Sequence, residues 1–600
     1  MSNQSPFKLS HPLRCIQAPF GSASFLTEEK IIDFKLNVQG EGKKLCPYVR
    51  CINDDNALFA RKPYFDSGVQ NGSVPELPDG NGHLLTIAPT RAGKGTGQII
   101  PNLLSWRGSV LVIDIKGENY LHSAGYREKK LKQKVLRFAP FEKVSEIWNP
   151  ILSIRADPKS NNSTPEEEED ARYLTNLLIT PSGSADGVFW ENSAKNFLEG
   201  LLLYVRTAPL PSDLQSNNSD TVDSENQHQV HERSMREVRR LLSLNKKAFK
   251  KLLTAMGETK RPLIVQAGNN LSRLMSKNGK TGQSILAMTL EQTAVWAYQR
   301  LHKVTYKPSA IPTDSEPAPN DFSFEQMRDG NTSIYLIIPP DYLTEYRAVL
   351  RVMIGFAMRE LRQSFVKHKK DDEYKEKPPV LFILDEFPQL AYMRPIEEAL
   401  LYLAGYDVRF WFFVQDVSQL QLHYKNSWQT FFANTGTQCF FGVSDIATAN
   451  LVSEMAGMTT TQHTSRSYEP PLMNANKEIN ANNELYYRLK DNTSYNLLPS
   501  YWLDALTALT NSSQDGLIYF YSKHFPRDHH PLPNVLKSET IANTSRQLIT
   551  PDEVMRLQED EQIVFIKGMK PIYCYRPNYY EFSPLKDRID IEPPHEVDFF

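Results

Sequence analysis

Short apolar runs, each bounded by polar or turn residues, recur along the chain. They are Leu84–Ile87, the run SVLVI before Asp114, the run SIYLIIP from Ser333 to Pro339, Val380–Leu384, and the run FWFFV before Gln415. Each run is too short to cross a membrane. Continuous apolar runs of this length are typical of strands that are buried on both faces of a parallel sheet. The pattern therefore predicts an α/β fold.

The apolar residues follow a different spacing in the middle of the chain. Between about 165 and 310, apolar residues recur at steps of three and four, as in ARYLTNLLI, NFLEGLLLYV, MREVRRLL and SILAMTLEQTAVWAY. This spacing places the apolar residues on one face of a helix. We therefore expect an all-α insert within the α/β fold. Phe189 and Trp190 are expected to be anchors of its core, and the alternative is a pair of rings on which DNA bases stack.

Later stretches are less regular. The segment TTTQHTSRSYEPPLMNANKEINANNE after Gly457 shows no apolar period and is expected to be a loose surface segment. Further on, Thr550, Pro551, Asp552 and Glu553 have the order of a helix cap, a first-turn proline and two acids. We expect a helix that begins at Pro551, with a structural role.

Composition fits a large protein of two or more domains with a sizeable core, since 40% of the 600 residues are apolar. The 68 basic and 70 acidic residues give a net charge of −2, so any contact with nucleic acid must be local. Five scattered cysteines favour a reducing compartment over a disulfide framework. The first 80 residues contain neither an 18-residue apolar span nor a signal peptide, which predicts a start without a membrane anchor.

The candidate chemistry begins with the glycine-rich turn APTRAGKGTG, between the run that ends at Ile87 and a helix start. Backbone N–H groups of such a turn curl around a phosphate where bulky side chains are absent. Lys94 supplies a flexible positive charge for the terminal phosphates. The turn departs from the general pattern at Ala88, where glycine is usual, and at Gly95, where Ser or Thr usually binds Mg²⁺. The predicted nucleotide-binding residues are Thr90, Arg91, Ala92, Gly93, Lys94, Gly95, Thr96 and Gly97.

Two acids, Asp385 and Glu386, directly follow the run Val380–Leu384, as in a Walker B strand. Ligands of open α/β sheets lie at the carboxyl ends of the strands, so both acids are expected to face the phosphate loop. Asp385 is the expected Mg²⁺ ligand. Glu386 is the expected catalytic residue that orients and deprotonates the attacking water.

Together these motifs resemble the coupling-protein ATPases of type IV secretion and conjugation, TraG/TraD-like members of the HerA/FtsK group of P-loop motors. The resemblance rests on APTRAGKGTG, Ile100–Arg127, GVFWENSAKNFLEGLLLYV from Gly187, ILDEFPQL, and LAGYDVRFWFFVQD up to Asp416. It implies a RecA-like P-loop nucleotide-binding domain with an inserted all-α domain. The tail Arg546–Tyr580 resembles the closing segment of that family, which implies that the helix from Pro551 is followed by two strands. Glycine at position 95 is common in that family, so the missing hydroxyl does not indicate an inactive site.

The resemblance also gives a role to one residue outside the general motifs. Gln415, at the end of its strand, is expected to sense the γ-phosphate or to position water, as a third catalytic residue beside Lys94 and Glu386. Thr96 follows directly after Gly95, the position at which Ser or Thr usually binds Mg²⁺, and is a second candidate ligand of Mg²⁺. ATP and Mg²⁺ are the expected cofactors.

Other charged residues are candidates for a role in the site, but each also has a simple structural explanation. Lys116 and Glu118 follow the second strand and are expected to order the site, or else to be an ordinary charged strand end. A multimeric motor needs an arginine finger that reaches a neighbour's nucleotide. Arg409 and Arg394 are candidates for it, and either also suits a surface ion pair.

These expectations divide the chain into four segments. Residues 1–79 form an N-terminal segment without transmembrane helices, and 80–160 form the first part of the nucleotide-binding domain. Residues 161–325 form the all-α inserted domain. Residues 326–600 form the second part of the nucleotide-binding domain with a C-terminal extension.

The expected function is that of an ATP-driven coupling protein, a homo-hexamer that recruits DNA or a relaxase–DNA or protein substrate and delivers it to a type IV secretion (conjugation) channel. Its expected partners are DNA, taken as single-stranded and relaxase-bound, and the channel and relaxosome proteins. Its expected place is the bacterial cytoplasm, at the cytoplasmic face of the inner membrane, with membrane contact only through partners. The alternatives are a soluble HerA/FtsK-type DNA pump and a slowly hydrolysing adaptor that recruits substrates, and the sequence leaves open whether the cargo is single-stranded DNA, duplex DNA or protein.

Overall fold

The computed structural model describes residues 82–160, 162–180, 187–211, 214, 232–277, 279–308, 318–368, 377–469, 535–576, 578–581 and 583–596. The chain divides into two compact units. The smaller includes Ala456–Leu548, and the larger includes Phe25–Met455 with Ile549–Phe600. The predicted N-terminal segment 1–79 lies outside the described residues.

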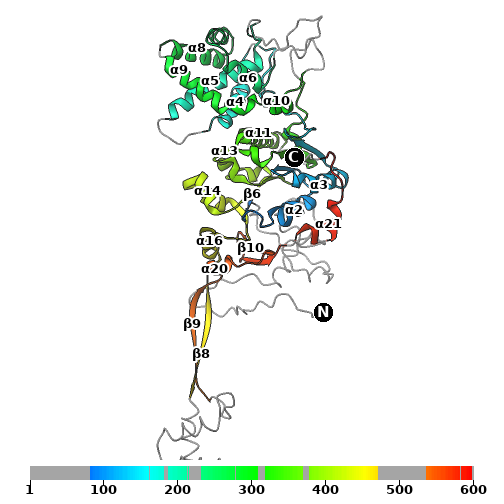
Figure 1. Ribbon diagram of the computed structural model, residues 1–600, viewed down its shortest axis with the longest axis vertical. Coiled ribbons are helices and arrows are strands. Elements are labelled where there is room, and N and C mark those ends of the chain that lie inside the picture. The colour runs from blue at the N-terminus through cyan, green and yellow to red at the C-terminus, as the bar shows by residue number, and fades with distance from the viewer. Residues whose placement is uncertain are drawn as a thin grey trace, which may run out of the picture. The chain divides into compact units, whose positions relative to one another are not determined.

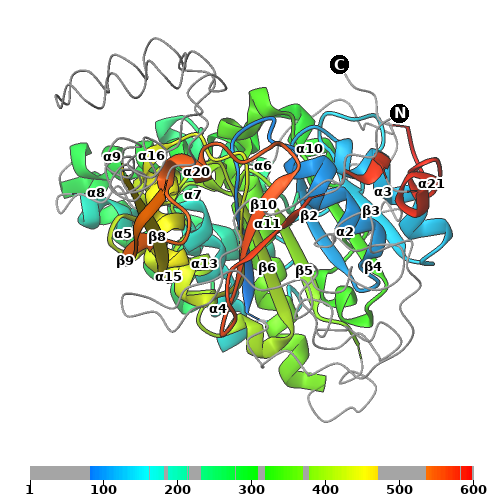
Figure 2. The same ribbon diagram turned by 90° about the horizontal axis from the view of Figure 1, so that it is seen from below.

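The larger unit contains a sheet whose strands lie at the centre of Figure 2. Nine strands form it, in the order β11–β10–β7–β1–β6–β5–β2–β4–β3. The strands are β1 (His83–Ile87), β2 (Val110–Asp114), β3 (Lys134–Phe138), β4 (Thr332–Ile337), β5 (Val380–Leu384), β6 (Val408–Val414), β7 (Thr435–Phe440), β10 (Glu561–Ile566) and β11 (Ile572–Tyr575). Neighbours from β7 to β3 run parallel. The two strands at the other edge are antiparallel. The predicted α/β class is confirmed.

The apolar runs became strands because the sheet buries them on both faces. Every residue of β1, β2 and β5 is buried. On one face, Leu103 of α2 (Ile100–Ser105) and Ala124 of α3 (Glu118–Lys129) pack in one cluster with Val112 of β2. Near the end of the chain, α21 (Ser583–Ile589) lies beside α2 and α3 (Figure 2). Leu585 of α21 belongs to one buried cluster with Leu104 of α2.

Between β3 and β4 the described chain leaves the sheet and forms a group of helices (Figure 1). They are α4 (Pro165–Leu178), α5 (Gly187–Thr207), α6 (Met235–Leu242), α7 (Lys246–Gly257), α8 (Pro262–Lys277), α9 (Gly279–Gln292) and α10 (Gln299–Thr305). The prediction of a core anchor is wrong for Phe189, whose side chain is 56% exposed. Trp190 meets it edge to face and is partly exposed. The cause is that other parts of the chain bury α5 only from Glu191 onwards.

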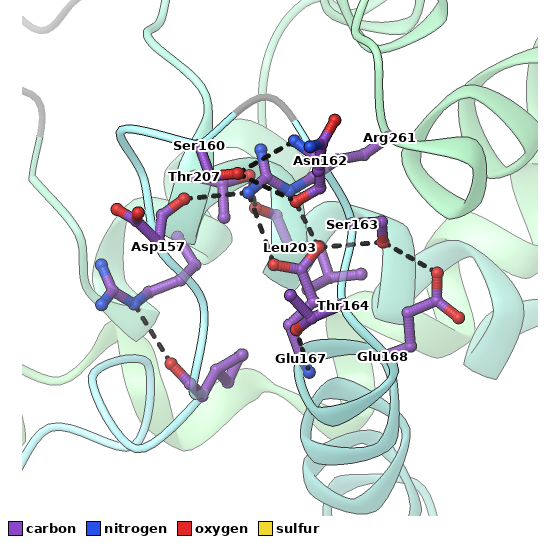
Figure 3. A network of polar contacts seen from close by, with 12 residues as sticks. Asp157, Ser160, Asn162, Ser163, Thr164, Glu167, Glu168, Leu203, Thr207 and Arg261 are labelled. Atoms are coloured by element: carbon purple, nitrogen blue, oxygen red, sulfur yellow. Dashed lines mark hydrogen bonds and ion pairs between the residues drawn. The ribbon is translucent and has the colours of Figure 1, made fainter.

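A buried ion pair holds the start of α4 against the residues before α8 (Figure 3). Arg261 Nε lies 2.9 Å from Glu167 Oε1, and the two side chains are 8% and 0% exposed. Arg261 also donates to the carbonyl oxygen of Asp157. Thr164 caps α4 by accepting from the N–H of Glu167. The cap and the ion pair together fix where the first long helix of the insert begins.

A second set of polar contacts joins the insert to α11 (Leu343–His368), the long helix that follows β4 and η8 (Pro340–Tyr342). Arg359 of α11 lies 2.7 Å from Asp170 of α4, and Tyr173 donates its hydroxyl to the carbonyl oxygen of Gly355. The helical insert is therefore attached to the sheet-bearing part by hydrogen bonds as well as by chain connections. Within the described ranges, no helix is both long and apolar enough to span a lipid bilayer.

The smaller unit holds a two-stranded antiparallel ribbon, drawn side by side in Figure 1. Its strands are β8 (Met458–Glu469) and β9 (Val535–Gln547), paired from Met458 with Gln547 to Glu469 with Val535. The expectation of a loose segment after Gly457 is thus wrong for residues 458–469, and the rest of that segment lies outside the described residues. Threonine-rich sequence suits a strand without showing an apolar period, because β-branched side chains favour extended backbone.

The end of the chain follows the predicted order. The helix α20 (Pro551–Val554) begins with a capping box between Thr550 and Glu553, and β10 and β11 come next. The two strands extend the sheet beside β7, which itself lies next to β1. The closing segment is therefore close to the turn that follows β1.

Candidate nucleotide-binding site

The glycine-rich turn lies at the carboxyl end of β1 and leads through a π-helical turn, η3 (Gly95–Ile99), into α2. Gly93 has φ of +85°, a backbone conformation that L side chains rarely adopt. The N–H of Gly97 donates to the carbonyl oxygen of Gly93 at 2.9 Å. A Cβ atom at Gly95 would meet nothing within 4 Å, so no neighbouring atom requires glycine at that position. All eight predicted nucleotide-binding residues, 90–97, belong to this turn and its helix start.

The structure brings the three predicted catalytic residues together. Lys94 Nζ lies 3.4 Å from Glu386 Oε1 and donates to the carbonyl oxygen of Ala88 at 3.1 Å. Gln415 Nε2 donates to the other oxygen of Glu386, Oε2, at 3.0 Å. The residues come from three different strand ends, those of β1, β5 and β6, which are adjacent in the sheet. A cation, a carboxylate and an amide thus converge beside the phosphate loop.

Two further carboxyl groups lie at the ends of neighbouring strands, where burial disfavours their ionised forms. Removal from water, with the nearby Glu386 carboxylate, raises the pKa of Asp385 to about 7, although Lys94 opposes the shift. Burial also raises the pKa of Asp114, at the end of β2, to about 6, although the N–H of Tyr120 donates to it. An ionised carboxylate in such a place gains from a nearby cation. Carboxylate oxygens are also the ligands that Mg²⁺ prefers, so Asp385 fits the predicted metal site.

The closing segment contributes residues that the sequence did not suggest. Arg576, just after β11, is 3% exposed and donates to the carbonyl oxygens of Gly93 and Ala92, each at 3.0 Å. Thr96, the second candidate metal ligand, donates its hydroxyl to Asn578 Oδ1 at 3.0 Å. No motif marks Arg576 or Asn578. The only signal was an arginine directly after the short closing strand, in the sequence CYRPNYY.

The remaining candidates take different places. Lys116 and Glu118 are both exposed, just after β2 and at the start of α3. Arg409 is near the amino end of β6, opposite the loops, and donates to the carbonyl oxygen of Ala404. Arg394, in α13 (Arg394–Ala399), has a side chain 73% exposed and forms an ion pair with Glu398 at 2.7 Å. Of the two arginines, only Arg394 projects into solvent.

This sheet, with a phosphate loop at β1, acids at the end of β5 and helices inserted after β3, defines a RecA-like P-loop protein. The fold is similar to that of the unbound monoclinic form of the bacterial conjugative coupling protein TrwBdeltaN70, with a TM-score of 0.51 and 12% identity over 82% of this chain and 84% of that chain. Plasmid coupling protein TrwB in complex with the non-hydrolysable ATP analogue ADPNP also gives a TM-score of 0.51, with 12% identity over 93% of this chain and 96% of that chain. At this identity the likeness concerns the fold alone.

Residues 16–487 and 534–593 match the family model for type IV secretory system conjugative DNA transfer, and the chain belongs to that family. It is 26% identical to a conjugal transfer protein TraG of Escherichia coli, over 94% of this chain and 78% of the relative. It is 28% identical to protein VirD4 of Rhizobium radiobacter, over 87% of this chain and 59% of the relative. Another E. coli TraG, 27% identical over 63% of this chain, is matched over 55% of its length. The chain thus spans about half to four fifths of the length of these relatives.

Proposed function

We propose that the chain is an ATP-driven coupling protein that recruits DNA or a relaxase–DNA complex and delivers it to a type IV secretion channel. The observation that carries the proposal is the convergence of Lys94, Glu386 and Gln415 at the phosphate loop of a chain in this family. Relatives named conjugal transfer protein and type IV secretion system-coupling protein support the same role.

Each of the three residues has a separate task in the proposed reaction. Lys94 binds the terminal phosphates of ATP. Phosphate oxygens accept hydrogen bonds, as do the carbonyl oxygen of Ala88 and the carboxylate of Glu386 that Lys94 contacts in the structure. Glu386 orients the attacking water and accepts its proton, a contribution of roughly 10²–10⁴-fold in rate for a positioned base. Gln415 holds one oxygen of that carboxylate in place, and its amide adds no charge to the site.

Asp385 and Thr96 would hold Mg²⁺. The positive charge of the ion would stabilise the negative charge that the phosphate oxygens carry in the transition state. Asp385 suits this task because burial and the nearby Glu386 carboxylate disfavour its ionised form, which a bound cation would stabilise. Thr96 suits it because a hydroxyl that donates its hydrogen to Asn578 still offers oxygen lone pairs to a cation. The amides of residues 90–97 would surround the phosphates.

The assembly in this proposal is a homo-hexamer with nucleotide sites at subunit interfaces. An arginine finger has to extend beyond its own subunit, so the exposed Arg394 suits that task better than the mostly buried Arg409. Single-stranded, relaxase-bound DNA is the proposed cargo, and channel and relaxosome proteins are the proposed partners. We place the protein at the cytoplasmic face of the inner membrane, with membrane contact through those partners.

Steady-state ATP hydrolysis with Mg²⁺, with and without single-stranded or duplex DNA, tests the proposal. Low salt is needed because phosphate contacts weaken steeply as salt rises. We expect DNA to stimulate hydrolysis, and Lys94→Ala and Glu386→Gln to abolish it. The exposed Lys130→Ala and Glu166→Gln are matched controls that should behave like the unmodified protein.

Transfer of a mobilisable plasmid from donor cells tests the coupling role separately from hydrolysis. If DNA stimulates ATP hydrolysis but donor cells without the protein still transfer the plasmid, the protein is instead a soluble DNA pump. If ATP hydrolysis is slow and does not respond to DNA, but plasmid transfer still requires the protein, the protein is an adaptor that recruits substrates. If Lys94→Ala and Glu386→Gln hydrolyse ATP at the normal rate, the site assignment itself is wrong.

A further inference from the structure

The phosphate loop accepts hydrogen bonds from a residue almost 500 positions away in the sequence. Arg576 donates through Nη1 to the carbonyl oxygen of Gly93 and through Nη2 to that of Ala92, contacts that span 483 and 484 residues. Nη2 also donates to the carbonyl oxygen of Glu559. The guanidinium carbon lies 4.5 Å from the ring centroid of Phe441. The side chain is therefore fixed by contacts on several sides.

The two carbonyl acceptors decide which way the loop's amides point. In a trans peptide the C=O and the N–H lie on opposite sides of the bond. The carbonyl group of Ala92 shares a peptide with the N–H of Gly93, and that of Gly93 shares one with the N–H of Lys94. When Arg576 holds both carbonyl groups, both N–H groups point away from it. These amides lie within the stretch that would surround a phosphate.

Gly97 shows how closely the arginine is fitted. A Cβ atom at Gly97 would lie 1.9 Å from Arg576 Nη1, and one at Gly93 would lie 2.8 Å from it. The absence of side chains at these two positions therefore makes room for the guanidinium as well as for an anion. By contrast, a Cβ atom at Gly95 would meet nothing within 4 Å.

We propose that Arg576 is a positioning residue for the nucleotide site: it holds the carbonyl groups of the phosphate loop outward, so that the loop's amides face the phosphates. The proposal rests on the proposed function insofar as the ligand is a nucleoside triphosphate. Arg576 acts through the loop, because both of its terminal nitrogens already donate to backbone carbonyl groups. The closing strands β10 and β11 thereby become part of the site.

Binding of a fluorescent ATP analogue with Mg²⁺ tests this in Arg576→Ala and Arg576→Lys. Loss of two charge-assisted hydrogen bonds should weaken binding about tenfold or more in Arg576→Ala. Lysine keeps the charge but cannot bridge two carbonyl groups. Arg576→Lys should therefore recover only part of the affinity, and recovery of all of it would mean that charge alone matters. Arg556→Ala, an exposed arginine of the same closing segment, is the matched control.

A double substitution separates the contact from general damage to the fold. Gly97→Ala should weaken nucleotide binding in the unmodified protein, where its methyl group would collide with the guanidinium. In Arg576→Ala the same change should cost much less, so the two effects should not add. Additive effects, or unchanged affinity in Arg576→Ala, would overturn the proposal.

Hydrogen–deuterium exchange gives an answer that does not depend on nucleotide binding. Arg576→Ala should raise amide exchange in the peptide that covers residues 88–99, with little change in peptides of the helical insert. A global rise, together with a lower melting temperature, would show that Arg576 only stabilises the fold. If the unmodified protein binds no ATP analogue, the proposed function fails, and exchange in the loop still decides whether Arg576 positions it.

Discussion

Gln415 Nε2 donates to Glu386 Oε2 at 3.0 Å, across 29 residues of sequence, and so fixes the carboxylate of the proposed catalytic base. Gln415→Ala should lower kcat for ATP hydrolysis by roughly 10–10²-fold with a smaller change in KM, because a base that turns freely is placed correctly less often. Steady-state kinetics measure both constants. Gln421→Ala, an exposed amide on the following helix α14 (Val417–Tyr424), should leave them unchanged.

Gln415→Glu places a carboxylate where the amide now donates. Two like charges at this distance repel, so the pKa of the carboxyl pair should rise and hydrolysis should be weak near neutral pH. We expect the remaining activity to increase toward higher pH in this variant. A variant with the pH profile of the unmodified protein would show that Gln415 does not contact Glu386 during turnover.

Protons and Mg²⁺ should compete for Asp385, whose pKa is raised to about 7. Below this pH the carboxyl holds a proton that must leave before a metal binds, so the Mg²⁺ concentration for half-maximal hydrolysis should rise up to about tenfold per pH unit. Above pH 7 it should level off. Titrations at pH 6, 7 and 8 measure this, and Asp385→Asn should remove the dependence along with most of the activity. An equal Mg²⁺ requirement at pH 6 and pH 8 would contradict the assignment.

Glu360, on α11, should make the fold less stable as pH rises. Burial raises its pKa to about 7, although Ser323 and the N–H of Phe324 donate to it. Between its unfolded pKa, near 4.5, and 7 the folded chain keeps a proton that the unfolded chain releases. Stability is therefore lost across this window, at up to about 1.4 kcal/mol per pH unit. Melting temperatures at pH 5 and pH 8 should differ less in Glu360→Gln than in the unmodified protein.

The buried pair between Arg261 and Glu167 predicts a large effect in the helical insert. Arg261→Ala leaves a buried carboxylate without its partner and should destabilise the insert by about 3–5 kcal/mol. Lys307→Ala, which breaks a much more exposed ion pair with Asp321, should cost less than about 1 kcal/mol. Urea unfolding followed by circular dichroism compares the two variants, and equal midpoints would show that the buried pair contributes no more than the exposed one.

The sequence predicted the sheet and the convergence of its strand ends because both follow from short-range patterns. Apolar runs identify buried parallel strands, and such strands carry their ligand-binding residues at one end. These patterns mark Lys94 and Glu386, whereas the role of Gln415 followed from the resemblance to the coupling-protein ATPases. Their roles in hydrolysis remain predictions.

The failures concern contacts between distant parts of the chain. The threonine-rich strand β8 has no apolar period, so a short stretch of sequence does not identify it as a strand. Its partner β9 begins at residue 535, so the pairing of the two strands cannot be recognised from neighbouring residues either. The exposure of Phe189 depends on which elements cover the first turn of α5. Arg576 reaches the phosphate loop only because β10 pairs with β7, which in turn pairs with β1.

The order of strands in the sheet also has a consequence during protein synthesis. The N–H of Phe410, in β6, donates to the ring of His83 in β1 across 327 residues, and β7, the other neighbour of β1, comes later still. At a synthesis rate of roughly 5–20 residues per second, β1 waits roughly 15–65 seconds for its first partner. Its apolar side chains need protection during that time. A nascent chain that stops before residue 408 therefore contains every residue of the phosphate loop but lacks the strands that shape it.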